Sequence, residues 1–319
     1  MHDKYGPSLL RARHDQVHVT DEAVAELSSF KAKPINFKIG FWDPEKNGVR
    51  YLKALIYNFA AGLSDENWKR LRRINNRGVG EPITITYDGE PVCMDYLLAV
   101  FELEFIANHV ELDGARVLEI GAGYGRTCHT MLSNQDVLEY HIIDLPNSLK
   151  LSAGYLRSVL EEEQFAKIRF TPIDEIDERY ADTEFDLSLN INSFAEMNAE
   201  TVDNYLAMID ERSRYFYIRD PVGKYLDGSL DGHSEGREIV ELALNTGKLR
   251  DVIDIHDNRA VEAHAPAFVE AYRPGPQWSC LANAWAPPWS YYWQAVFGKE
   301  ATQQLVLGEQ LRLENEIRP

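Results

Sequence analysis

Basic residues, cysteines and long apolar runs are scarce in this chain of 319 residues, and each shortage excludes a class of protein. Lys and Arg number 33 against 51 Asp and Glu, so the formal net charge is −18. A nucleic-acid partner normally requires a basic face. The one strongly basic run, KRLRRINNR at 69–77, fits a solvated helix face and its C-terminal end. The acidity serves solubility, or it favours a cationic substrate.

The three cysteines, Cys93, Cys128 and Cys280, lie far apart and form neither a CxxC motif nor an even disulfide framework. No segment approaches the length of a membrane span, and the first residues lack the apolar stretch of a secretory signal. We therefore expect a reduced, cytoplasmic protein with no membrane partner. Hydrophobic residues make up 45% of the chain, enough for one large domain or a core plus a smaller one.

Three glycines occupy alternate positions in VLEIGAGYGRTCHTML, residues 117–132, between an apolar strand and a helix. Glycine accepts positive φ and lets a ligand touch the backbone. The free N–H groups of a turn that opens a helix bind an anionic or polar group. A dinucleotide site spaces its glycines as GxGxxG, whereas Arg126 occupies the position of that third glycine here. The spacing therefore disfavours a dehydrogenase.

The next strand, EYHIIDLP at 139–146, ends in Asp144, 23 residues after Gly121. A carboxylate at this place can accept hydrogen bonds from both ribose hydroxyls of a nucleoside cofactor. The alternative is that Asp144 caps the helix beginning near Asn147. Strand, glycine turn, helix, strand and acid in this order favour ribose contact. Leu145 is assigned to the same cofactor site.

The ExGxGxG spacing resembles motif I of the class I S-adenosylmethionine (SAM) dependent methyltransferases. Further segments resemble, in order, parts of a family of sugar O-methyltransferases, over roughly residues 77–220: VGEP, LEIGAGYGR, IIDLPNSLKLSAGYL and FDLSLNINSFAEM. The resemblance implies SAM as cofactor, with Gly121, Gly123 and Gly125 against its methionine end and Glu119 near its amino group. It also implies methyl transfer to a hydroxyl of a sugar or aminocyclitol.

Strands and helices alternate from Arg116 onward, which predicts a parallel sheet with crossover helices. Strands are expected at 116–120, 139–143, 167–172, 185–191, 214–219, 251–255 and 290–297. Helices are expected between them at 126–133, 147–163, 199–210 and 235–245. The predicted class is α/β, a Rossmann-like seven-stranded methyltransferase sheet with helices on both faces. The resemblance makes its last strand antiparallel.

Three regions are expected along the chain. Residues 1–90 form a mainly helical N-terminal cap, 91–298 the SAM-binding core, and 299–319 a tail. The helical periodicity lies at 21–30, 47–62, 65–75 and 93–110, and ITITYDG at 83–89 predicts a hairpin that turns at Asp88 and Gly89. We expect the cap to close over the acceptor, with Trp42 and Arg77 as substrate contacts. The tail has helical apolar spacing and could form a homodimer or fold back on the core.

Ligands of open α/β sheets lie beyond the carboxyl ends of the strands. Asp174, after the third strand, is placed near the adenine or simply in water. The NINSF segment, 190–194, follows the fourth strand, where the transferred methyl should emerge. Asn190 is assigned to the cofactor and Asn192 and Ser193 to the substrate, although short polar residues also form turns.

Methyl transfer depends mainly on in-line placement, but a hydroxyl or protonated amine also needs a base. Glu196, Asp220 and His233 are the catalytic candidates, and His256, beside an orienting Asp257, is a substrate contact. A guanidinium acceptor would require Glu196 and Asp220 as a pair of carboxylates. Together they would bind its N–H groups bidentately and accept its proton. A hydroxyl would instead depend on His233 or His256. For each histidine an ordinary surface or core role is the alternative.

Two further segments are rich in one residue type. DEIDERYAD, at 174–182, is typical of a solvated surface, and no cluster with transition-metal spacing occurs, so no metal is expected. WSCLANAWAPPWSYYW, at 278–293, holds aromatic rings that could bind a sugar or a cation. We expect 291–293 to pack within the last strand. Trp278, Trp285 and Trp289 are expected in a Pro-rich loop, as a lid or interface.

Three functions remain open after the sequence is read. The first is SAM-dependent methylation of a small polar metabolite, at a hydroxyl of a sugar or amino sugar. The second is N-methylation of a cationic small molecule such as the guanidinium of arginine. The third, of a different class, is a SAM-binding scaffold without catalysis.

Overall fold

The computed structural model describes residues 8–18, 21, 25, 28, 47–226 and 236–299. The chain divides into two compact units, Met1–Gly62 with Ile83–Cys93, and Leu63–Pro82 with Met94–Pro319. Several predicted features fall outside the described residues: Trp42, His233, most of the helix expected at 21–30, and the tail beyond Lys299.

In the first unit the described residues form helices and one hairpin. Its elements are α1 (Leu9–His18), α4 (Gly48–Ala61), β1 (Thr84–Tyr87) and β2 (Glu90–Cys93). Asp88 and Gly89 have φ values of 49° and 84°, the left-handed conformation that a two-residue hairpin turn requires. The predicted hairpin is therefore confirmed. Tyr57 of α4 packs edge-on against Tyr87 of β1, with ring centroids 5.3 Å apart.

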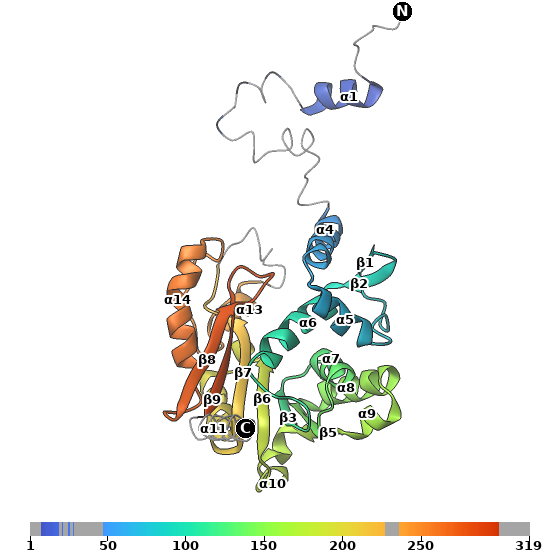
Figure 1. Ribbon diagram of the computed structural model, residues 1–319. Helices are drawn as coiled ribbons and strands as arrows, with labels where there is room; N and C mark the ends of the chain where they lie inside the picture. The colour runs from blue at the N-terminus through green and yellow to red at the C-terminus, as the bar shows by residue number, and fades with distance from the viewer. Residues whose placement is uncertain are drawn as a thin grey trace, which may run out of the picture. The chain divides into compact units, whose positions relative to one another are not determined.

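The second unit is built on a seven-stranded sheet (Figure 1). Its strands are β3 (Arg116–Ile120), β4 (Glu139–Asp144), β5 (Ile168–Pro172), β6 (Phe185–Ile191), β7 (Ser213–Pro221), β8 (Trp278–Trp285) and β9 (Tyr292–Lys299). Their order in the sheet is β5-β4-β3-β6-β7-β9-β8. Neighbours are parallel except where β9 runs antiparallel to β7 and β8. The predicted Rossmann-like seven-stranded sheet with a reversed last strand is confirmed.

Helices cover both faces of this sheet. The described helices of this unit are α5 (Asp65–Arg73), α6 (Met94–Ala107), α7 (Arg126–Asn134), α8 (Pro146–Val159), α9 (Glu162–Ala166), α10 (Ile176–Arg179), α11 (Ala199–Arg212), α13 (Arg237–Leu244) and α14 (Asn258–Ala271). Two single-turn 3₁₀ helices, η2 (Ile173–Glu175) and η3 (Phe194–Glu196), follow β5 and β6. None of the helices in the described ranges is long and apolar enough to cross a membrane.

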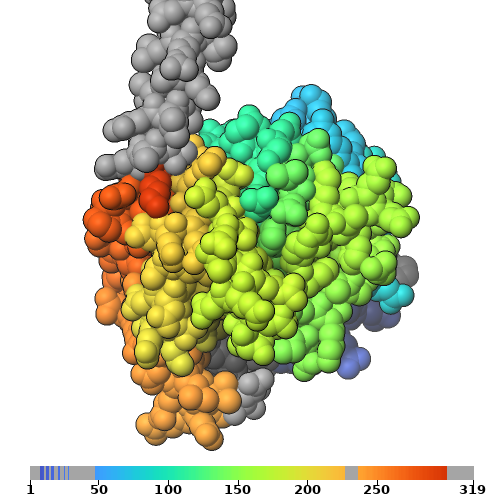
Figure 2. All heavy atoms as spheres, turned by 90° about the horizontal axis from the view of Figure 1, so that it is seen from below, coloured from blue at the N-terminus to red at the C-terminus, as the bar shows by residue number. Residues whose placement is uncertain are grey.

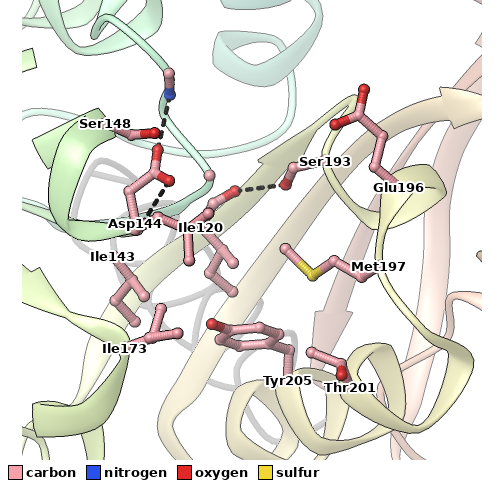
Figure 3. A pocket seen from close by; sticks show the side chains of 13 residues that line it. Ile120, Ile143, Asp144, Ser148, Ile173, Ser193, Glu196, Met197, Thr201 and Tyr205 are labelled. Atoms are coloured by element: carbon pink, nitrogen blue, oxygen red, sulfur yellow. Dashed lines mark hydrogen bonds between the residues drawn. The ribbon is translucent and has the colours of Figure 1, made fainter. Parts of the chain in front are cut away.

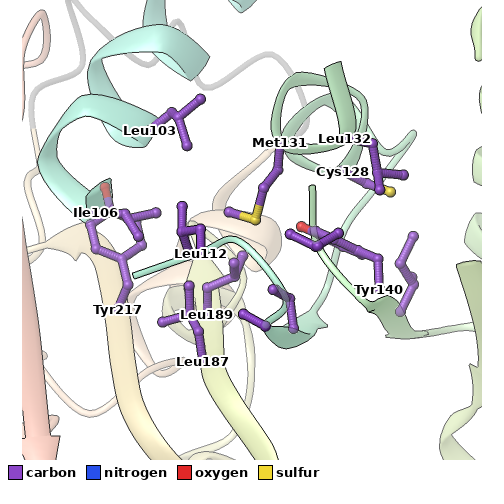
Figure 4. Close-up of a cluster of buried hydrophobic side chains, with 14 of the residues drawn as sticks. Leu103, Ile106, Leu112, Cys128, Met131, Leu132, Tyr140, Leu187, Leu189 and Tyr217 are labelled. Carbon is purple, nitrogen blue, oxygen red and sulfur yellow. The ribbon is translucent and has the colours of Figure 1, made fainter. Parts of the chain in front are cut away.

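Strand alternation divides the core into two clusters, because successive side chains point to opposite faces of a sheet. One cluster joins α6, α7 and α8 to the face that carries Val117 and Leu189 (Figure 4). The other joins α11 and α14 to the face that carries Ile120 and Phe216. In the space-filling view the green part of the chain lies on the right and the orange part on the left (Figure 2).

The sequence prediction was wrong for the sixth strand. Residues 251–255 form no strand and contribute only an isolated bridge between Lys224 and Val252. The strand is instead β8, inside the segment expected to be a Pro-rich loop. β8 carries small residues, lies at the sheet edge and is irregular between Cys280 and Ala282, so the two-residue periodicity is interrupted. Its first residue, Trp278, is buried in the core rather than placed in a lid.

Candidate functional site

A cavity of about 420 Å³ lies at the carboxyl ends of β3, β4 and β6 (Figure 3). Its walls come from the glycine turn after β3, the start of α8, η2, η3 and the first half of α11. The lining residues are Ile120, Gly121, Gly123, Ile143, Asp144, Leu145, Ser148, Ile173, Ser193, Glu196, Met197, Thr201 and Tyr205. This is the place where open α/β sheets bind ligands.

The three glycines of the turn all have positive φ, but their surroundings differ. A Cβ on Gly121 would lie 2.3 Å from the Ser193 hydroxyl, and one on Gly125 would lie 2.8 Å from Leu156. A Cβ on Gly123 would meet no atom of the described chain within 4 Å. Gly121 and Gly125 therefore permit close packing of neighbouring segments. Gly123 leaves room at the cavity wall for a ligand to approach the backbone.

Asp144 connects the end of β4 to the glycine turn. Its carboxylate accepts hydrogen bonds from the backbone N–H of Gly123 at 3.0 Å and of Leu145 at 2.7 Å. The N-cap of α8 is Leu145, without a side-chain capping bond, so the helix-capping alternative for Asp144 is wrong. Each carboxylate oxygen keeps a second lone pair for a ligand hydroxyl.

The NINSF segment is fastened to the end of β3 by polar side chains. The amide of Asn190 donates to the carbonyl of Ile120 at 2.9 Å and accepts from the N–H of Phe194 at 3.2 Å. Ser193 lines the cavity and donates to the same carbonyl at 3.1 Å. Asn190 is fully buried and is not among the lining residues, so its direct contact with a cofactor stays a prediction.

Glu119 lies on the opposite face of β3 from the cavity. It is 2% exposed and accepts a hydrogen bond from the Tyr140 hydroxyl at 2.8 Å. Burial raises the pKa of Glu119 to about 7. In the structure this carboxyl faces α7 and not the cavity, and its contact with the SAM amino group stays a prediction.

Arg126, the residue that breaks the dinucleotide glycine register, belongs to a buried ion network. Its guanidinium donates to both carboxylate oxygens of Glu102 at 2.8 and 3.1 Å. Arg219 lies 3.5 Å from the same carboxylate and donates to Asn192 Oδ1 at 2.9 Å. Removing one member of such a network would leave an uncompensated buried charge. Asn192 thus contacts Arg219 in the structure and is not among the residues lining the cavity.

The two acidic catalytic candidates lie in different surroundings. Glu196 is exposed and lines the cavity (Figure 3). Asp220 is fully buried at the end of β7, where its Oδ2 accepts from the Tyr272 hydroxyl at 3.2 Å. Its Oδ1 has no hydrogen-bond partner in the described part of the chain. Burial raises the pKa of Asp220 to about 8.

Three other predicted contacts lie away from this cavity. Asp174 is exposed on η2, and its neighbour Ile173 lines the cavity instead. Arg77 donates to the carbonyls of Leu71 and Ile74 at the end of α5. His256 lines a second cavity beside α14. Within the described ranges no group of three His, Cys, Asp or Glu could hold a metal ion.

Sequence reasoning missed several residues that line the cavity. These are Ile120, Ile143, Ser148, Ile173, Met197, Thr201 and Tyr205. Thr201 and Tyr205 are four residues apart on α11 and therefore share one face of that helix. That spacing, on the helix that follows the fourth strand, could have identified both residues as members of the site from the sequence.

No protein-family profile matches the chain, and no curated protein matches it. The solved structures that are similar to it include three with a TM-score of 0.42 each. The methyltransferase domain of bacterial CtHen1 is 14% identical, over 63% of this chain and 96% of that one. The mitomycin 7-O-methyltransferase MmcR is 14% identical, over 92% of this chain and 76% of that one. The pyocyanin biosynthetic protein PhzM is 13% identical, over 83% of this chain and 71% of that one. Similarity at this level carries no assignment of substrate.

Replacing the two glycines at the cavity separates packing from conformation. Gly121→Ala and Gly123→Ala both place a side chain at positive φ, which costs about 1–2 kcal/mol each. Gly121→Ala also drives its methyl into Ser193, so we expect a loss of unfolding free energy of about 3 kcal/mol or more. Urea unfolding of both variants measures the difference. Equal losses would contradict the close approach at Gly121, and Ser193→Gly should partly rescue Gly121→Ala.

Asp220 should make the stability of the protein fall as pH rises. The unfolded carboxyl releases its proton near pH 3.8, whereas the buried one keeps it up to about pH 8. Between these values the unfolding free energy decreases by up to about 1.4 kcal/mol per pH unit. Asp220→Asn preserves the size of the side chain but removes its ionisable group. The unfolding free energy of this variant should therefore decrease less between pH 5 and 8. Asp174→Asn, at an exposed position, is the control, and unchanged slopes in both variants would contradict the buried state of Asp220.

Proposed function

We propose that this protein is a SAM-dependent methyltransferase of a small polar metabolite. The observation that carries the proposal is the hydrogen bond between Gly123 and Asp144 at the wall of one cavity. It joins the glycine turn to the acid that ends the next strand. The cavity lies beside β3, whose neighbours on either side are β4 and β6, where the strand order reverses. That is the position at which doubly wound sheets bind nucleoside cofactors.

The lining residues fit the parts of SAM. Asp144 offers free carboxylate lone pairs to the ribose hydroxyls, and Ile143 and Ile173 offer apolar surface to the adenine. Gly123 leaves its side of the cavity open to the methionine end. A volume of about 420 Å³ lies in the range of small-molecule sites. The sulfonium of SAM supplies an electrophilic methyl, so the residues of the protein mainly orient the acceptor.

The acceptor is proposed to be a hydroxyl of a sugar or amino sugar. Glu196 supports this choice because it is an exposed carboxylate at the cavity, able to orient a hydroxyl or pair with an ammonium group. The alternative guanidinium acceptor requires Glu196 and Asp220 together. Asp220 is fully buried and does not line the cavity, which supports this alternative less.

The function is tested by incubating the protein with isotopically labelled SAM and mixtures of polar metabolites. Mass spectrometry should find a product that carries the labelled methyl group. Amino sugars, neutral sugars and arginine derivatives are compared as separate pools. Tight SAM binding without a labelled product in any pool would favour the scaffold, and no SAM binding would reject both functions.

Asp144→Ala should weaken SAM binding strongly. Two ribose hydrogen bonds to a charged acceptor are worth roughly 1.5–3 kcal/mol each, so the affinity should fall by about 100-fold or more. Calorimetric titration with SAM measures the change. Asp113→Ala is the matched control, because Asp113 also accepts a backbone hydrogen bond, from Asp136 at 2.8 Å, but does not line the cavity. Equal affinities for both variants and the unmodified protein would exclude ribose contact by Asp144.

Glu196→Gln should reduce turnover while leaving SAM affinity within about twofold, because its carboxylate is proposed to serve the acceptor. For a cationic acceptor the loss should be nearly complete. For a hydroxyl acceptor His233→Ala should be the more damaging change. Steady-state rates of both variants are compared with Glu200→Gln, an exposed acid of α11 outside the lining. Near-normal rates in Glu196→Gln and His233→Ala would contradict a catalytic role for either residue. Catalysis would then depend only on the positioning of the acceptor and SAM.

A further inference from the structure

A second cavity, of about 320 Å³, lies between the start of α14 and the turn that joins β8 to β9. It is lined by His256, Asn258, Val261, Glu262, Trp285, Ser290 and Trp293. None of these residues lines the cavity beside the glycine turn. β7 separates β6 of the first cavity from β9 of the second. At about 4.8 Å per strand the two cavities lie roughly 10–20 Å apart.

Two indole rings form the aromatic part of this cavity. Trp285 and Trp293 are directly opposed across the β8–β9 pair. The Trp285 indole N–H donates to the carbonyl of Trp289 at 2.8 Å, and that of Trp293 donates to Asn283 Oδ1 at 3.0 Å. Both ring nitrogens are thus occupied by partners within the hairpin. A ligand in the cavity would therefore contact the carbon atoms of the two rings. Trp285 is 48% exposed, so its ring is accessible to such a ligand.

The cavity also contains the carboxylate of Glu262, which no described residue neutralises. Glu262 lies one helical turn after Asn258 on α14, and its carboxylate makes no ion pair or hydrogen bond with any residue that the structure describes. The lining includes neither Lys nor Arg. Val261, which is 2% exposed, adds an apolar wall. The net charge of −18 adds a surrounding potential that attracts cations.

We propose that this cavity binds an organic ammonium cation. Aromatic rings attract cations, and a carboxylate forms a charge-assisted hydrogen bond with an ammonium group. The apolar part of the ligand packs against Trp285 and Val261, and its ammonium group pairs with Glu262. A neutral polyol could stack on the same rings and bind Asn258 and Ser290, but it would gain no ion pair from Glu262. This site is independent of the proposed methyl transfer.

The test compares two probes of similar shape and different charge, cyclohexylammonium chloride and cyclohexanol. Calorimetric titrations of the full-length protein are made with each probe, with and without SAM. Saturable binding of the cation is expected, at least about tenfold tighter than that of the alcohol. It should weaken as salt is raised, because the ion pair is partly exposed. Equal binding of the two probes, or no binding of the cation, would overturn the proposal.

Three variants locate the site. Glu262→Gln should weaken the cation about tenfold or more without changing the binding of the alcohol, and Trp285→Leu should weaken the cation similarly. Glu270→Gln removes the same charge from an exposed position of α14 and should change neither. Unchanged melting temperatures establish that each variant is folded. If Glu262→Gln and Glu270→Gln bind the cation equally, Glu262 is not its partner and the proposal fails.

The exposed tryptophans could instead form an interface with a second copy of the chain. Sedimentation of the unmodified protein and of Trp285→Leu over a range of concentrations separates these cases. An unchanged oligomeric state together with lost cation binding supports the ligand site. Dissociation of an oligomer on Trp285→Leu, with no saturable cation binding in the unmodified protein, would overturn it.

Discussion

The close contact between Gly121 and the segment that follows β6 is the constraint on which the cavity depends. Because Gly121 lacks a Cβ, the Ser193 hydroxyl can approach the turn and donate to the carbonyl of Ile120. Asn190 adds a second bond to that carbonyl. These bonds bring the ends of β3 and β6 together. The cavity that contains Asp144 and Glu196 can then form between the glycine turn, α8 and α11.

Within the described ranges, buried ionisable side chains at this edge of the sheet are paired on one face and unpaired on the other. On the face covered by α6 and α7, Glu102 lies between Arg126 and Arg219, so each charge has an opposite partner. On the other face the Tyr272 hydroxyl is the one side chain, among the described residues, that hydrogen-bonds to Asp220. Desolvation therefore raises the pKa of Asp220 to about 8, and the carboxyl avoids its charge rather than pairing it. Glu196, exposed at the cavity, remains available to a ligand.

Local patterns predicted the elements whose residues are constrained by local physics. The central strands are buried on both faces and therefore appear as apolar runs, and β6 was placed at 185–191 with correct bounds. The hairpin turn at Asp88 and Gly89 was found because few residues accept its backbone angles. β8 was missed because an irregular edge strand of small residues gives no clear periodicity. The 251–255 segment is rich in Val and Ile but forms only an isolated bridge and does not pair in the sheet.

The sequence by itself determined the fold class, the glycine turn and the acid at the end of β4, since each depends on residues close together in the chain. Only the tertiary structure decided which polar side chains share a cavity. Glu196, in the 3₁₀ helix that follows β6, and Asp220, near the end of the neighbouring β7, are both acids at this edge of the sheet, yet one is exposed at the cavity and the other fully buried. Glu119 and Ile120 are adjacent but point to opposite faces. Glu102, the carboxylate that Arg126 and Arg219 share, comes from α6, and a linear pattern does not encode such distant packing.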